Sequence, residues 1–313
     1  MGYAAFNIVR LAQIRDFVAV VDAGSISAAA RLLGVSQPGL TKSIRSLETE
    51  LAVSLLQRTP RGVLMTRYGR AFYARARAAH SELDKAHQEL VQMSGVHSGK
   101  VAIGFGPMAA ALVVPRAVQQ FRERYPAVEL RLLEGFVHAL MPLVRDETLD
   151  MMIGPRFPGN RIDPALRYRP IFHNDQIIVV RRGHPQARPR SIVELADACW
   201  LSFEPRAVID RVLVALGLPG ARQLIQCESL NVMVALLADT DMLAVTSRRL
   251  LSMPQAGVAL QEISTTVRMP PMTTGLFVRA DAPLTPAAAA MAKALVEIGR
   301  ALPAGEATTA RRR

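Results

Sequence analysis

The stretch SISAAARLLGVSQPGLTKSIRSLE, residues 25–48, interrupts a helical pattern with a glycine and a proline and then resumes it. Gly34 can adopt the left-handed backbone conformation that ends a helix. Ser36 and Pro38 are typical of a new helix start, because a serine hydroxyl caps the first turn and proline lacks an N–H that would be unpaired there. Ser27 is the expected cap of the first helix. The stretch therefore predicts two short helices joined by a tight turn.

The second of these helices has an apolar face and a polar face. Its apolar residues recur at spacings of four, three and four and are expected to face a core: Leu40, Ile44, Leu47 and Leu51. The polar face keeps Gln37, Thr41, Lys42 and Arg45. This pattern is typical of a helix-turn-helix, in which glutamine can pair with adenine and a lysine or arginine can contact guanine or phosphate. The structural alternative is an ordinary pair of packed helices with a polar face.

Residues 55–66, LLQRTPRGVLMT, predict a strand, a turn and a second strand. We expect Arg58 and Arg61 on the turn of this wing, where they can reach DNA phosphates or a minor groove. Between Arg31 and Arg77 the chain has nine Lys or Arg and two acidic residues, within a total net charge of +12. The excess favours an anionic partner, although a solvated basic surface would carry the same charge.

A long helix is predicted over residues 67–93, which hold no proline. Its small and apolar residues repeat at alternating spacings of four and three: Phe72, Ala76, Ala79, Leu83, Ala86, Leu90 and Met93. Such a heptad seam predicts pairing with the same helix of a second chain. Packing of the seam against the chain's own domain is the alternative.

The pattern changes after SGVHSGK, residues 94–100, whose glycines and serines predict a hinge at 95–100. From residue 101 to 302 apolar strands alternate with helices, which predicts an α/β domain with a mainly parallel sheet. A frayed basic tail is expected at 303–313. The fold class expected for the chain is α/β with a mostly helical N-terminal domain.

Composition narrows the functional classes. Cys199 and Cys227 are the chain's two cysteines, and they lack metal-ligand spacing, so no metal or cofactor is expected. No apolar run reaches about 18 residues and no signal peptide is evident, so we expect a cytoplasmic protein without membrane contact. Residues 104–106 read GFG, but Ala109 leaves the dinucleotide motif GxGxxG incomplete. The chain therefore offers little sign of an enzyme.

Residues 17–69 resemble the N-terminal signature of the LysR-type transcriptional regulators, from FVAVVDAGSISAAARLLG through VSQPGLTKSIRSLE to RTPRGVLMTRYG. The resemblance implies a winged helix-turn-helix domain at 1–66, a linker helix for dimerisation at 67–94, and a two-lobed effector domain similar to periplasmic binding proteins (type 2) at 101–302. Lobe one would hold 101–164 and 271–302, and lobe two 165–270. The phrases CWLSF, CESLNV and LTPAAAAMAKAL look most like the branch that responds to aromatic sulfonates, aromatic acids or sugars.

The resemblance also implies site residues. Contacts with double-stranded promoter DNA fall on Arg31, Ser36, Gln37, Pro38, Thr41, Lys42, Arg45, Arg58 and Arg61. An effector pocket falls on loops at strand ends: Gly106, Pro107, Met108, Phe136, Arg156, Ser202, Phe203, Glu228, Ser229 and Thr246. Many relatives have Ser or Thr where this chain has Gly106 and Phe136, so two hydroxyl anchors for a carboxylate are missing.

Together these features predict a DNA-binding transcriptional regulator controlled by a small organic inducer, anionic or aromatic, bound between two lobes. The heptad seam predicts a dimer, the resemblance implies a tetramer, and RNA polymerase would be an indirect partner. Two alternatives remain: an architectural DNA-binding protein without a ligand, and an enzyme that uses the α/β cleft.

Overall fold

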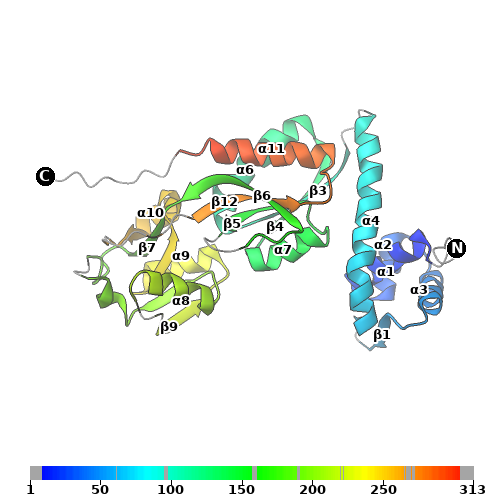
Figure 1. Cartoon of the computed structure of the whole chain (residues 1–313), viewed down its shortest axis with the longest axis horizontal. Coiled ribbons are helices and arrows are strands. Elements are labelled where there is room, and N and C mark those ends of the chain that lie inside the picture. Colours follow the sequence, from blue (N-terminus) through cyan, green and yellow to red (C-terminus); the bar gives the residue numbers. More distant parts are fainter. Residues whose placement is uncertain are drawn as a thin grey trace. The chain divides into compact units, whose positions relative to one another are not determined.

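The computed structural model describes residues 9–303 except 61, 95–97, 157–160, 189–190, 219, 221, 264, 266–268 and 270–271. The predicted Arg61, the first half of the predicted hinge and the tail from 304 lie outside the described residues. The chain divides into two compact units. The first holds the elements from α1 to α4, and the second holds those from β3 to α11 (Figure 1).

The first unit is a small helical domain with a two-stranded wing. Its elements are α1 (Leu11–Ala23), α2 (Ile26–Leu33), α3 (Gln37–Leu51), β1 (Leu56–Thr59), β2 (Gly62–Met65) and α4 (Arg67–Met93). Phe17 and Leu47 are fully buried at the centre of its core, and Leu40 and Ile44 of α3 are at most 3% exposed. The inward face predicted for α3 is confirmed.

Capping groups set the bounds of α2 and α3. The Ser25 hydroxyl accepts a hydrogen bond from the backbone N–H of Ala28 at 3.1 Å, so Ser25 caps α2 and the expected cap at Ser27 is wrong. Gly34 ends α2 at φ +65°, a left-handed conformation that glycine adopts without steric cost. The Ser36 hydroxyl accepts from the N–H of Gly39 at 3.2 Å, as predicted for the start of α3.

The wing is an antiparallel hairpin fastened to the helices. The Glu48 carboxylate of α3 accepts the backbone N–H groups of Leu55 and Leu56 at 2.7 and 3.0 Å. Arg58 pairs with Val63 inside the hairpin ladder, so it lies on β1 and not on the turn where it was expected. It is nevertheless exposed, because strand residues alternate between the two faces of a hairpin.

Helix α4 has the predicted bounds, but its seam divides into two parts. Phe72 and Ala76 pack into the core of their own unit, and the Phe72 ring lies 5.4 Å from that of Phe17 between centroids. The remaining seam residues are exposed: Ala79, Leu83, Ala86, Leu90 and Met93. A heptad pattern does not distinguish an intrachain partner from a second chain, and the first part of the seam has an intrachain partner.

The second unit contains two five-stranded sheets. The first has the order β4 (Ala127–Glu134), β3 (Ser98–Phe105), β5 (Met151–Arg156), β12 (Met272–Arg279) and β6 (Leu166–Asn174). The second has the order β11 (Leu260–Glu262), β7 (Gln176–Arg181), β10 (Leu243–Ser247), β8 (Cys199–Ser202) and β9 (Gln223–Gln226). Both sheets are mixed and not mainly parallel as expected, since β12 runs antiparallel to β5 and β7 runs antiparallel to β10.

Helices cover both faces of the sheets. The helices of this unit are α5 (Pro107–Leu112), α6 (Val114–Arg124), α7 (Val137–Arg145), α8 (Arg206–Ala215), α9 (Leu230–Asp239), α10 (Pro254–Ala259) and α11 (Pro286–Arg300), with 3₁₀ turns at Ile192–Leu195 and Arg248–Ser252. In the first sheet α6 and α11 lie on one face and α7 on the other (Figure 1). Met151 and Met152 accordingly belong to cores on opposite faces.

Two predicted boundaries shift. β3 already begins at Ser98, within the predicted hinge. β6 pairs with β12 in the first sheet, so the chain crosses to the second sheet at Asp175 and not near residue 164. The sequence LRYRPIFHN of β6 is too polar to stand out as a buried strand, because β6 lies at the sheet edge.

Candidate functional site

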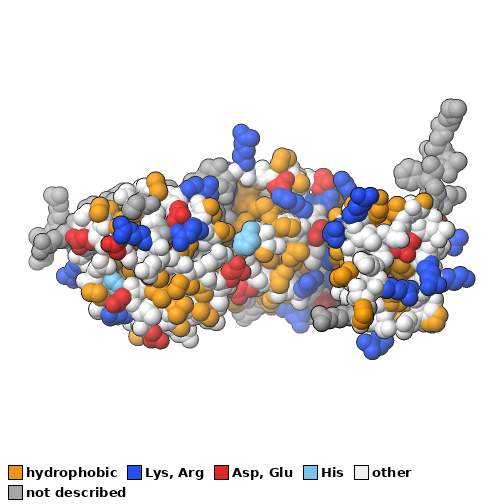
Figure 2. Space-filling view, turned by 90° about the horizontal axis from the view of Figure 1, so that it is seen from below, with side chains coloured by type: hydrophobic (Ala, Val, Ile, Leu, Met, Phe, Trp, Pro, Cys, Tyr) orange, Lys and Arg blue, Asp and Glu red, His pale blue; other side chains and the backbone are white. Residues whose placement is uncertain are grey.

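The polar face of α3 is not buried by any of the residues that the structure describes. Gln37, Lys42 and Arg45 are exposed and Thr41 is half-buried. With Pro38 they border a shallow open depression that continues along the helix to Glu50. The charged side chains visible on the first unit in Figure 2 are mostly Lys and Arg. The four side chains predicted to read DNA therefore lie together and can reach a partner.

Three further predicted contacts lie near the start of this helix or on the wing. Arg31 is exposed on α2, and Arg58 is exposed on β1. The Ser36 oxygen accepts the capping bond from Gly39, which leaves its O–H free to donate to a phosphate oxygen. Polar groups that can bind phosphate thus surround the exposed face of α3.

Side-chain contacts fix α3 against α1. The Ser43 hydroxyl donates to the Asp16 carboxylate at 2.6 Å, and the Gln13 amide donates to Glu50 at 3.0 Å. Hydrogen bonds from Gln13 and then Ser46 hold the pKa of the Glu50 carboxyl below its ordinary value. These contacts orient α3 on its unit before any partner arrives.

A polar cluster likewise joins α4 to α1. Asp22 of α1 accepts from the Tyr73 hydroxyl and forms an ion pair with Arg77 at 2.8 Å. Burial, followed by the bond to Asp22, raises the pKa of Tyr73 to about 12. Tyr73 therefore remains a neutral hydrogen-bond donor throughout the physiological pH range.

The second unit contains a cavity of about 120 Å³ where the two sheets meet. Its walls come from the ends of strands in both sheets and from the segments that follow them, including Gly106 after β3, Phe136 after β4 and Phe203 after β8. This is the place where α/β folds bind ligands, because strand ends leave loops and helix starts around a crevice. The cavity is the candidate effector site.

A buried polar cluster forms one wall of the cavity and connects the two sheets. The Asn174 amide of β6 donates to the Thr274 hydroxyl of β12 at 2.8 Å. The Ser247 hydroxyl at the end of β10 donates to the Asn174 carbonyl oxygen at 3.2 Å. Asn174 and Thr274 are each 3% exposed and Ser247 is 5% exposed. A ligand in the cavity would lie directly against the segments where the chain crosses between sheets.

Phe136, Phe203 and the acid Glu204 also line the cavity. The backbone N–H of Glu204 donates to the Ser202 hydroxyl at 2.9 Å. Burial raises the pKa of the Glu204 carboxyl, and His138 partly opposes this. Glu204 is the one ionisable side chain among the described residues that line the cavity.

Most predicted effector residues meet at this cavity, and three do not. Those present are Gly106, Pro107, Met108, Phe136, Ser202, Phe203 and Thr246. Arg156 lines a neighbouring, more open cleft, with its guanidinium 5.5 Å from the centre of the Tyr168 ring. Glu228 and Ser229 line another cleft, and the Ser229 hydroxyl caps α9.

The sequence prediction also missed lining residues, chief among them Asn174, Gln176, Met152, Met272 and Thr274. Asn174 was missed because β6 was not recognised, whereas Gln176 was expected only as the first residue of a strand, β7. The polar residues 173–176, between the apolar runs that end at Phe172 and begin at Ile177, are the signal that could have revealed them.

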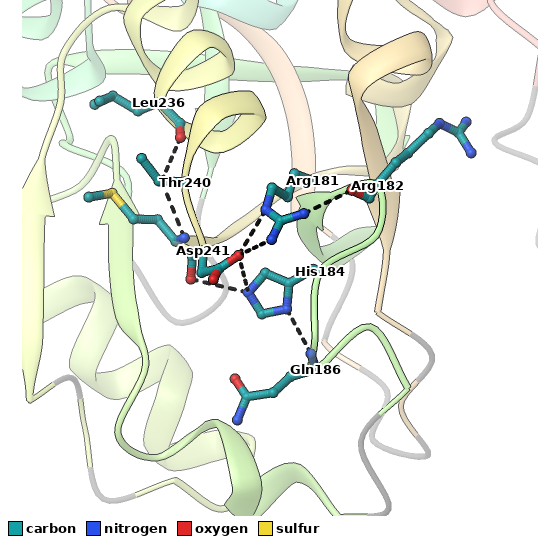
Figure 3. A network of polar contacts seen from close by, with 8 residues as sticks. Arg181, Arg182, His184, Gln186, Leu236, Thr240 and Asp241 are labelled. Atoms are coloured by element: carbon teal, nitrogen blue, oxygen red, sulfur yellow. Dashed lines mark hydrogen bonds and ion pairs between the residues drawn. The ribbon is translucent and has the colours of Figure 1, made fainter.

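A second polar network in this unit is structural (Figure 3). Arg181 donates to the Asp241 carboxylate at 2.8 Å, and the Nε2 of the buried His184 lies 3.2 Å from the Asp241 carbonyl oxygen. The backbone N–H of Gln186 donates to His184 Nδ1 at 3.0 Å, which places the imidazole proton on Nε2. Both ring nitrogens are thus occupied by backbone groups, and His184 ties the chain after β7 to the segment before β10.

Two surveys of the described residues complete this description. No three His, Cys, Asp or Glu side chains among them gather where they could hold a metal ion. None of the described helices combines the length and apolar character needed to span a bilayer.

Comparison with known proteins gives matches over nearly the whole chain. The family "Bacterial regulatory helix-turn-helix protein, lysR family" matches residues 11–70, and "LysR substrate binding domain" matches residues 94–300. The SDS degradation transcriptional activation protein of a Pseudomonas species is 32% identical over 288 residues, which are 90% of this chain and 94% of that protein. The regulator GbpR of Azospirillum brasilense is 28% identical and covers 89% of this chain and 83% of its own length.

Solved structures agree with the fold. Full-length OxyR C199D from Pseudomonas aeruginosa superposes with a TM-score of 0.71 at 21% identity, covering 94% of this chain and 95% of that one. Full-length CbnR in complex with its target DNA superposes with a TM-score of 0.63 at 18% identity, covering 93% and 100%. The chain therefore belongs to the LysR family of bacterial transcriptional regulators, with a DNA-binding helix-turn-helix domain followed by a ligand-binding α/β domain.

Proposed function

We propose that the protein is a cytoplasmic, dimeric regulator that reads promoter DNA through α3 and the wing and responds to a small molecule in the cavity of the second unit. The exposed polar face of α3 is the observation that supports DNA reading. Gln37, Lys42 and Arg45 are assigned to base edges or phosphates in the major groove. Arg31, Ser36, Pro38, Thr41, Arg58 and Arg61 are assigned to the backbone or to apolar contact with bases.

The dimer rests on the exposed part of the α4 seam. Leu83 is 47% exposed, Leu90 68% and Met93 73%, although all three are apolar and follow one face of the helix. The same helix of a second chain would cover this stripe by heptad packing. Two-fold pairing would present two α3 helices to two half-sites of a palindromic operator. A tetramer and indirect contact with RNA polymerase extend the same proposal.

Control by a ligand rests on the position of the cavity. It lies against Asn174 and Thr274, at the two places where the chain passes between the sheets. A ligand that fits one arrangement of the sheets better than another would shift the population toward that arrangement. Paired chains could carry this change to the spacing of the two DNA-reading helices. A purely architectural DNA-binding protein would have no use for such a cavity.

A footprint on the DNA upstream of the protein's own gene tests this function. Wild type should protect two half-sites on one face of the duplex. Gln37→Ala should weaken the free energy of binding by about 1–3 kcal/mol at that site, because a base contact is removed. Its binding to random DNA should change little. Gln223→Ala, which changes an exposed glutamine of β9, is the matched control. An equal loss of binding to both DNAs would show that Gln37 does not contact bases. If folded wild-type protein protects no site, the prediction of an operator in this DNA is wrong.

A further inference from the structure

From the cavity we infer that the controlling ligand is uncharged, about the size of one aromatic ring, and carries a hydrogen-bond acceptor for Gln176. This inference rests on the proposed control by a ligand and names the chemical class of that ligand. It departs from an anionic effector, one of the two kinds expected from the sequence, because Arg156, the one arginine among the predicted effector residues, lies in another cleft.

The first argument is charge. The described residues that line the cavity include no Lys, Arg or His, and the one ionisable group, Glu204, is an acid that supplies no positive charge. A charged ligand loses its hydration on entry and needs a partner of opposite charge to compensate. Three backbone positions on the wall offer no N–H to an anion. The N–H groups of Gly106 and Gly135 are bonded to Ile153 and Phe105, and Pro107 has no N–H.

A cation is also disfavoured. Its possible partner Glu204 has a raised pKa, because burial makes the ionised carboxylate costly, and His138 opposes this rise only in part. The remaining polar groups on the wall are uncharged amides and hydroxyls, among them Asn174, Thr246 and Thr274. An uncharged ligand avoids both desolvation penalties.

The second argument is size and apolar character. A cavity of about 120 Å³ is somewhat smaller than the engineered 150 Å³ apolar cavity that binds benzene. Aliphatic and aromatic side chains from both sheets and from α8 face this space, including Met108, Phe136, Phe203 and Ile209. Such walls suit one planar ring or an aliphatic group of similar volume.

The third argument is an unused donor. Gln176 lines the cavity, and its side-chain Nε2 is buried without a hydrogen-bond partner among the described residues. Its neighbour Asn174, by contrast, already bonds Thr274 and Ser247. A buried N–H without a partner is costly, so a ligand that places a carbonyl or hydroxyl oxygen there would relieve the cost. Gln176 therefore specifies an acceptor on the ligand.

Isosteric probes separate these properties in the full-length protein. Benzamide is neutral with an acceptor, benzoate is its anionic counterpart, benzamidinium is its cationic counterpart, and toluene lacks an acceptor. Binding can be followed by the fluorescence of Trp200, the one tryptophan of the chain, buried on β8 two residues before Ser202, and by the thermal midpoint. Benzamide should bind at least tenfold more tightly than the other three. Equal or tighter binding of benzoate or benzamidinium, or no binding of benzamide, would overturn the inference.

Variants test the role of Gln176. Gln176→Leu should weaken benzamide binding at least fivefold and leave toluene binding within twofold of wild type. If the leucine variant does not fold, Gln176→Glu replaces it and should also weaken benzamide binding. Gln223→Leu on exposed β9 is the control and should change neither. Unchanged benzamide binding in folded Gln176 variants would overturn the acceptor requirement. Footprinting without ligand separates the two proposals. If the protein protects DNA but binds benzoate more tightly than benzamide, only the inferred ligand class is contradicted. If folded protein protects no DNA, the proposed function is contradicted.

Discussion

The rings of Phe136 and Phe203 lie 5.5 Å apart between centroids at an interplanar angle of 34°. Phe136 follows β4 of the first sheet and Phe203 follows β8 of the second, so this contact joins the two sheets at the cavity wall. Aromatic pairs at this distance stabilise beyond the area they bury. The pair therefore couples the stability of the second unit to the closeness of its two sheets.

This coupling can be measured by a double-mutant cycle with Phe136→Leu and Phe203→Leu. We expect a coupling energy of about 0.5–1.5 kcal/mol, because each single change already removes the ring–ring contact. Urea unfolding followed by Trp200 fluorescence reports on this unit, since the chain has no other tryptophan. A cycle of Phe136→Leu with Phe121→Leu is the control, because Phe121 stacks on Tyr125 instead. Additive free energies for Phe136 and Phe203 would contradict the contact.

If Arg58 of the wing contacts a DNA phosphate, its removal should change the salt dependence of DNA binding. Arg58→Ala should weaken binding to all DNA sequences alike and reduce the slope of log K against log salt concentration by about one unit, because one phosphate contact is lost. Titrations at several salt concentrations on operator and random DNA check this. Arg222→Ala, which changes an exposed arginine of the second unit, is the control. An unchanged slope in the Arg58 variant would exclude a phosphate contact.

If the exposed seam of α4 is the dimer contact, a charge placed in it should lower the mass of the protein in solution. Leu83→Glu should shift the protein toward monomer, because paired helices would bring two carboxylates into an apolar seam. Light scattering at matched concentrations measures the shift. Ala74→Glu places the same charge at an exposed position of α4 off the seam and should leave the mass unchanged. A wild-type mass for Leu83→Glu would reject the seam as the dimer contact.

Glu204 makes a prediction about pH. Since burial raises its pKa in the folded state, the folded protein binds this proton more tightly than the unfolded chain does. The resulting stabilisation is fully present below the ordinary value of 4.5 and is lost as the pH rises through the folded-state pKa. Glu204→Gln should therefore gain stability relative to wild type between pH 4 and pH 8.

Urea midpoints across this pH range measure the gain, and Glu194→Gln, at an exposed position, is the control. A difference between Glu204→Gln and wild type that stays constant with pH, or that falls as the pH rises, would show that burial does not raise this pKa. The isosteric amide keeps the volume of the side chain, so the pH dependence isolates the charge.

Local patterns in the sequence were sufficient for the N-terminal unit. The spacing of Leu40, Ile44 and Leu47 predicted which face of α3 is buried, and Ser36 predicted where α3 begins. The bounds of α4 also follow from its own residues. Helical periodicity and capping depend on residues a few positions apart, so one stretch of chain carries the whole signal.

The cavity depended on contacts between distant segments. Only the folded chain shows that β6 joins the first sheet, which places Asn174 on the cavity wall, and that Arg156 lies in a different cleft. Likewise, only packing shows that Phe72 belongs to the core of its own unit whereas Leu83 is exposed. The sequence by itself determined the helix proposed to read DNA and the linker helix, because their signals are local. The tertiary structure decided the charge and shape of the ligand site, because strand pairing brings together residues about 100 positions apart, such as Asn174 and Thr274.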